Sequence, residues 1–114
     1  MKDQLYMLQA GYCKDERGPL YCSDSIGVEG LLSFFPQLRA LIDVHYLEFP
    51  RPRAQLVSML GENHQSIPVL ILAPDRRIDA ATLEPHQVNG RKFFDDERII
   101  RRYLSAQYQL PQAS

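Results

Sequence analysis

The sequence predicts one α/β domain built on a central mixed sheet with helices packed against it. Strand-like and helix-like segments alternate along the 114 residues, in the order strand, helix, strand, helix, strand, strand, helix. The composition agrees, because 45% hydrophobic residues, with five Phe and six Tyr, indicate a globular chain large enough for one core. We therefore expect a four-stranded sheet flanked by about three helices within a single domain, residues 1–114.

The strands are predicted from runs of β-forming residues. Residues 5–8 and 44–49 are short runs of this kind, and residues 67–72 form a nearly continuous apolar run, typical of a buried central strand. Asn89-Gly90 is a strong turn signal, and we expect a short edge strand after it at residues 91–94. Residues 78–88 are ambiguous and receive no assignment.

The helices are predicted from apolar spacing and from residues that stop or cap them. A helix at about 24–35 ends at Pro36, and a short helical turn follows it. The next helix has Pro52 at its first position and Gly61 just past its end. A last helix is capped by Asp95 or Asp96, with Glu97 and Arg101 paired four residues apart on its outer face.

Charge and cysteine content exclude several classes of function. The net charge of −1 gives no general attraction for nucleic acid or anionic membranes, and we interpret Arg51, Arg53, Arg76 and Arg77 as solvated surface charges. No signal peptide and no apolar stretch of ~20 residues is present, so we expect a cytoplasmic protein without a membrane partner. The two cysteines and three histidines lack any recognised ligand spacing, so we expect no metal site.

The segment Cys22-Ser23-Asp24-Ser25 begins the first predicted helix and carries the candidate chemistry. Free N–H groups and the positive end of the helix dipole favour the thiolate of Cys22, which is the reactive form. Ser25 lies three residues on and can hydrogen-bond this sulfur, but it cannot resolve a mixed disulfide as a second cysteine would. An inert, partly buried Cys22 is an equal alternative.

Cys13 lies in a long polar loop, residues 10–21, between the first strand and the first helix. It is a candidate resolving cysteine for Cys22 if the loop folds back. The alternative is a plain loop cysteine, and the loop geometry that decides between the two cannot be deduced from a sequence.

Three stretches together resemble the thioredoxin fold. Cys22 to Ser25 resembles the active-site motif of monothiol glutaredoxins. Residues 66–70, Ser-Ile-Pro-Val-Leu, resemble the glutaredoxin and glutathione transferase segment whose proline is cis, and residues 94–104 resemble the last helix of transferase N-terminal domains. The whole chain also resembles a family of short, uncharacterised bacterial proteins assigned to the thioredoxin-like fold, notably in residues 28–32 and 49–53.

The resemblance implies a binding site for glutathione as a co-substrate, with no tightly bound cofactor. Ile67 and a cis Pro68 would present backbone to an extended peptide, and Asp95 and Asp96 would receive the amino group of the γ-glutamyl end. The alternatives are a trans proline beginning an edge strand and an ordinary helix cap that needs no ligand.

Two hypotheses of different class follow. The first is a glutaredoxin-like oxidoreductase that uses Cys22 in monothiol exchange with glutathione or a protein thiol. The second is a non-catalytic interaction domain, including a homodimer, that keeps the fold for binding. A fold hosts many functions and does not choose between them.

Overall fold

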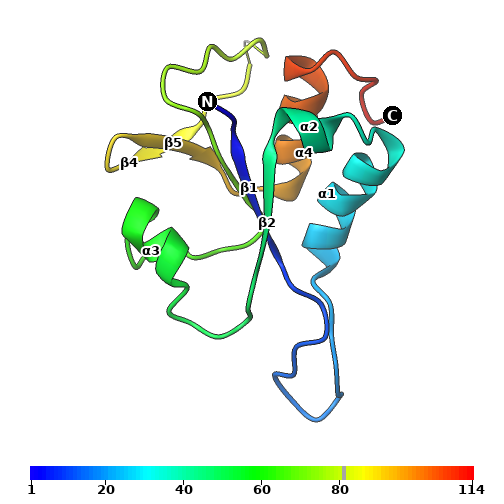
Figure 1. Ribbon diagram of the computed structural model, residues 1–114, viewed down its shortest axis with the longest axis vertical. Helices are drawn as coiled ribbons and strands as arrows, with labels where there is room; N and C mark the ends of the chain where they lie inside the picture. Colours follow the sequence, from blue (N-terminus) through cyan, green and yellow to red (C-terminus); the bar gives the residue numbers. More distant parts are fainter. Residues whose placement is uncertain (81) are drawn as a thin grey trace.

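The computed structural model describes residues 1–80 and 82–114 and shows a mixed five-stranded sheet with helices on both faces (Figure 1). The elements in chain order are β1 Gln4–Leu8, α1 Ser23–Phe34, α2 Leu38–Leu41, β2 Asp43–Leu47, α3 Ala54–Leu60, β3 Val69–Ile71, β4 His86–Val88, β5 Arg91–Phe94 and α4 Glu97–Gln107. The strand order is β2-β1-β3-β5-β4. β1 and β2 are parallel, and the other neighbouring pairs are antiparallel.

Alternation along the strands divides the core into two layers. In β1, Leu5 and Met7 join the larger cluster beneath α1 and α4, whereas Tyr6 joins the smaller cluster that includes Leu56 of α3. Such alternation is required because successive side chains of a strand point to opposite faces. Figure 1 accordingly shows α1 and α4 on one side of the sheet and α3 on the other.

The sheet has one strand more than the sequence predicted. β4 lies in the segment 78–88 that received no assignment, and it pairs with β5 across the Asn89-Gly90 turn, where both residues have positive φ. The expected edge strand β5 is therefore interior, and β4 forms the edge. Phe94 is buried in the larger core cluster and Phe93 in the smaller one, so β5 is covered on both faces.

The helices differ from expectation in number and in one boundary. The short turn after Pro36 is a helix in its own right, α2, which brings the number of helices among the described residues to four. α3 begins at Ala54 and not at Pro52, because Arg53 has an extended backbone (φ −91°, ψ 93°) and precedes the helix as its cap. Gly61 ends α3 as predicted, with φ of 87°.

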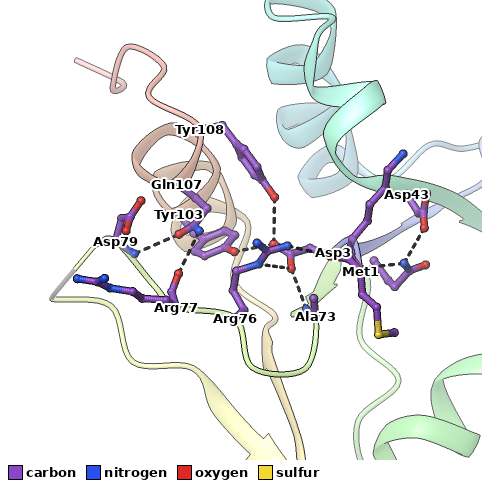
Figure 2. A network of polar contacts seen from close by, with 12 residues as sticks. Met1, Asp3, Asp43, Ala73, Arg76, Arg77, Asp79, Tyr103, Gln107 and Tyr108 are labelled. Atoms are coloured by element: carbon purple, nitrogen blue, oxygen red, sulfur yellow. Dashed lines mark hydrogen bonds and ion pairs between the residues drawn. The ribbon is translucent and has the colours of Figure 1, made fainter.

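The amino end of β1 is held by a buried carboxylate, drawn in Figure 2. Asp3 is 0% exposed, and its Oδ1 accepts hydrogen bonds from the Ala73 backbone N–H at 2.8 Å and from Arg76 Nε at 3.0 Å. Its Oδ2 accepts from the hydroxyls of Tyr103 at 2.5 Å and Tyr108 at 3.3 Å. A buried charge is tolerated only when it is paired and hydrogen-bonded, and these four bonds meet that condition.

The same network joins segments that are far apart in the sequence. Figure 2 shows that it connects the amino terminus, the segment after β3 and the end of α4. Gln107 extends it by donating to the Arg77 carbonyl at 3.0 Å and accepting from the Asp79 N–H at 3.1 Å. Arg76, interpreted from the sequence as a solvated surface charge, is instead an ion-pair partner of Asp3.

No helix among the described residues is long and apolar enough to cross a membrane.

Candidate functional site

Cys22 caps the amino end of α1, as the sequence predicted. Its backbone is extended (φ −84°, ψ 117°), and its Sγ accepts a hydrogen bond from the Ser25 backbone N–H at 3.4 Å. The side chain is partly exposed, and the sulfur is a free thiol. A sulfur that accepts an N–H at a helix start is stabilised in its negative form.

Ser25 contacts the site in a different way from the one expected. Its backbone N–H, and not its hydroxyl, bonds the sulfur, while its Oγ accepts from the Leu8 N–H at 3.2 Å. Ser25 is 5% exposed. Its hydrogen bond with Leu8 fixes the start of α1 to the end of β1.

Ile67 and Pro68 lie at the same end of the sheet. The Ile67–Pro68 peptide is cis, as the resemblance implied. β3 runs antiparallel to β1 with Tyr6 opposite Val69, so the chain enters β3 at the end of the sheet where β1 finishes. Since neighbouring strands lie about 4.8 Å apart, the Ile67–Pro68 segment borders the strand end to which α1 is fixed.

Arg53 is the main site residue that the sequence did not reveal. It was interpreted as a surface charge, but it is only 9% exposed. Its guanidinium donates to the carbonyls of Gln65 at 2.6 Å and Phe49 at 2.8 Å, and its own N–H donates to the Gln65 side chain at 2.7 Å. Arg51, two residues earlier, is exposed, so composition alone could not tell the two apart.

The positive charge of Arg53 has no acidic partner within the described residues. Its acceptors are neutral carbonyls, and its Nε has no hydrogen-bond partner there. Burial lowers the pKa of Arg53 and Arg51 lowers it further, whereas the negative forms of Cys22 and Tyr12 oppose this.

An aromatic stack covers this arginine. The guanidinium lies 5.8 Å from the centre of the Phe49 ring, which stacks on Tyr12 at 4.6 Å with an interplanar angle of 5°. Tyr12 belongs to the long loop 10–21, whose two arms meet in an antiparallel bridge between Tyr12 and Leu20. Figure 1 shows this loop extending away from the sheet.

Cys13 is exposed on that loop and is a free thiol, as is Cys22. The bridge between Tyr12 and Leu20 closes the loop on itself, next to Cys13. The resolving role of Cys13 remains a prediction.

Asp96 is a helix cap and Asp95 is not. The Asp96 carboxylate accepts from the N–H groups of Arg98 at 2.9 Å and Ile99 at 3.3 Å, which confirms the predicted cap of α4. The Asp95 carboxylate lies 3.2 Å from the ring of His86. Binding of a ligand amino group by either residue stays a prediction.

The paired carboxylate of α4 was also predicted. Glu97 accepts from Arg101 Nε at 2.7 Å, although this pair is part-buried rather than on an outer face. Gly27 of α1 explains the burial, because a Cβ there would lie 3.1 Å from the Glu97 carboxylate.

Comparison with known proteins places the chain in a family. The model of the family described as "Protein of unknown function (DUF3088)" matches residues 2–112. The chain belongs to this family. No curated protein and no solved structure matches it. The DUF3088 match confirms an uncharacterised family, whose description states no activity, and it leaves the resemblance to thioredoxin-like proteins as a prediction.

No group of three or more His, Cys, Asp or Glu side chains within the described ranges is arranged to hold a metal ion.

Proposed function

We propose that this DUF3088 protein is a thioredoxin-like protein in which Cys22 performs monothiol thiol–disulfide exchange with glutathione or a protein thiol. The observation that carries the proposal is the sulfur itself: a partly exposed free thiol that caps α1 and accepts the Ser25 N–H. The buried Arg53, which lacks a carboxylate partner among the described residues, supports it.

The proposed reaction has two balanced steps. The Cys22 thiolate attacks one sulfur of a disulfide, a new S–S bond forms, and the departing sulfur leaves as a thiolate that takes a proton from water. A second thiol, such as glutathione, then attacks the mixed disulfide and releases Cys22 as the thiolate. Over the two steps one disulfide and one thiol become another disulfide and another thiol: the first half of the substrate leaves as a thiol, and the half held by Cys22 leaves joined to the incoming thiol.

Each neighbouring residue has a defined role in this proposal. The Ser25 N–H and the Arg53 charge stabilise the negative sulfur before attack and when it leaves. The Ile67–Pro68 segment, which borders the same strand end, offers backbone groups to an extended thiol peptide. Asp95 and Asp96 stay candidates for the amino group of glutathione.

The decisive experiment measures intact mass after exposure to oxidised glutathione. We expect one glutathione adduct on wild type and on Cys13→Ser, and none on Cys22→Ser. A disulfide-reduction assay coupled to glutathione reductase should show turnover with the first two proteins only. An internal disulfide in wild type would instead assign Cys13 the resolving role, and an unmodified Cys22 would refute the proposal.

The proposed role of Arg53 is tested by comparing its substitution with the same substitution at Arg51. Arg53→Met should slow adduct formation, because it removes the positive charge that we propose stabilises the negative sulfur of Cys22. Arg51→Met changes an exposed residue of the same type and serves as the matched control. Far-UV circular dichroism of both variants checks that the fold is kept, and equal rates for the two variants would contradict the role of Arg53.

A second candidate, a non-catalytic domain that forms homodimers, is favoured by one surface. Phe34, at the end of α1, is 84% exposed. It borders a groove of about 1110 Å³ between α1, α4 and the carboxyl-terminal residues. Sedimentation equilibrium of wild type and Phe34→Ser tests it: a dimer lost in the variant supports dimerisation, and a monomeric wild type excludes it.

A further inference from the structure

A pocket opens beside Cys22 at the end of β1, and the proposed glutathione contacts do not involve it. Its volume is about 330 Å³, near the lower limit for small-molecule sites. Its apolar lining comes from the end of β1, the start of α1 and one residue of β2, and includes Met7, Leu8, Tyr21, Ile26 and Tyr46. The residues implied to bind glutathione, Ile67, Pro68, Asp95 and Asp96, are not among those that line it.

The one charged side chain that lines this pocket among the described residues is already paired. Its carboxylate, Glu29, accepts the Tyr46 hydroxyl at 2.8 Å and Arg39 Nη2 at 3.2 Å. The negative charge of Glu29 is therefore neutralised by its ion pair with Arg39. Among the residues that line the pocket, an ionised ligand would find no unpaired opposite charge, and it would still lose its hydration.

One feature favours an apolar occupant next to the sulfur. Tyr21 is 63% exposed and Tyr46 is 44% exposed, so two aromatic side chains line the pocket without being covered. Ser25, which also lines the pocket, is nine-tenths buried, and its Oγ already accepts a hydrogen bond from the Leu8 N–H.

We propose that this pocket binds the uncharged apolar or aromatic half of a small disulfide or thiol that reacts at Cys22. The inference rests on the proposed thiol–disulfide exchange and names the class of its second substrate. Glutathione, with two carboxylates and an ammonium group, does not fit this description. The pocket therefore accepts the other half of a mixed disulfide, covalently linked to the sulfur that Cys22 attacks.

Methanethiosulfonate reagents of graded size and charge test this, on a Cys13→Ser background so that only Cys22 reacts. The thiolate attacks the sulfenyl sulfur, the new disulfide forms, and methanesulfinate leaves with the electron pair. Rates followed by intact mass are compared for reagents carrying methyl, benzyl, trimethylammonioethyl and sulfonatoethyl groups. N-acetylcysteine provides the intrinsic rate of each reagent.

We expect the benzyl-to-methyl rate ratio at Cys22 to exceed that of N-acetylcysteine about tenfold, because the ring buries apolar surface. Neither charged reagent should gain such an advantage. Ala10→Phe fills the pocket and should return the ratio to that of the free thiol. Ala40→Phe, the same change at an exposed position of α2 outside the pocket, should leave the ratio as in the parent protein.

Ile26→Lys provides a second test at a half-exposed helix position, where lysine is compatible with folding. It should abolish the benzyl advantage and raise the sulfonatoethyl rate relative to the trimethylammonioethyl rate. A Cys22 that reacts with oxidised glutathione and the methyl reagent but shows no benzyl preference refutes the pocket alone. A Cys22 that reacts with none of them refutes both proposals.

Discussion

Replacing Asp3 by Asn removes the charge from the buried network while keeping the shape of the side chain. The carboxylate accepts four hydrogen bonds, two on each oxygen. Asparagine keeps one carbonyl oxygen, so its amide group must face either the two tyrosine hydroxyls or the Ala73 N–H and Arg76. In the first arrangement the hydroxyls lose their acceptor, and in the second two N–H donors meet the amide group.

The loss of the counter-charge adds to this. Removing one partner of a buried ion pair costs about 3–5 kcal/mol. The Arg76 side chain is 24% exposed and recovers part of its hydration, so we expect the low end, about 3 kcal/mol. For a domain whose total stability is roughly 5–15 kcal/mol, this is a large fraction.

Urea unfolding followed by circular dichroism measures the free energy of unfolding. Asp43→Asn is the matched control, because Asp43 is partly exposed and its side chain accepts one hydrogen bond, from Gln4 Nε2 at 2.8 Å. It should cost under ~1 kcal/mol. If Asp3→Asn costs no more than Asp43→Asn, the buried carboxylate does not hold the fold as argued.

Three further outcomes are expected. Burial raises the pKa of Tyr103, and burial together with the nearby Asp3 raises the pKa of Tyr108 to about 12. Above pH 10 the folded state therefore keeps tyrosine protons that the unfolded state loses. Stability is complete below pH 10 and falls above it, and Tyr103→Phe should reduce the slope of the free energy of unfolding by ~1.4 kcal/mol per pH unit between pH 10 and 12. Asp96→Ala should cost about 1 kcal/mol in urea unfolding, and Asp95→Ala clearly less. Gly61→Ala, at φ 87°, should cost about 1 kcal/mol, whereas Gly30→Ala within α1, where a Cβ meets open space, should stabilise by a similar amount.

The sequence predicted the elements that have strong local signals. Pro36 ended α1, Asn89-Gly90 made the hairpin turn, and Cys22 and Asp96 capped their helices. Each of these depends on a residue whose own backbone preference or side-chain chemistry decides the outcome. β4 has only three residues, His86–Val88, with no buried side chain among them, so no apolar pattern marks it.

The partners of buried charges could not be predicted because they come from distant parts of the chain. Asp3 pairs with Arg76 and Tyr103 across separations of 73 and 100 residues. Arg53 and Gln65 are nearer in sequence, yet nothing distinguishes Gln65 from the other polar residues of its loop. Tertiary contact alone decides which arginine is buried, which is why the four arginines discussed above were all assigned to the surface.

The two buried polar clusters lie at opposite ends of β1, and this separates stability from reactivity. Asp3 precedes the strand and closes its amino end, whereas Leu8 at its other end donates to Ser25 beside Cys22. Contributions from sites without shared partners are additive within a few tenths of a kcal/mol. Variants of the Asp3 cluster should therefore lower the free energy of unfolding without changing the rate at Cys22 under folding conditions. A parallel loss of both in Tyr103→Phe would show that the two ends of the strand are coupled through the core.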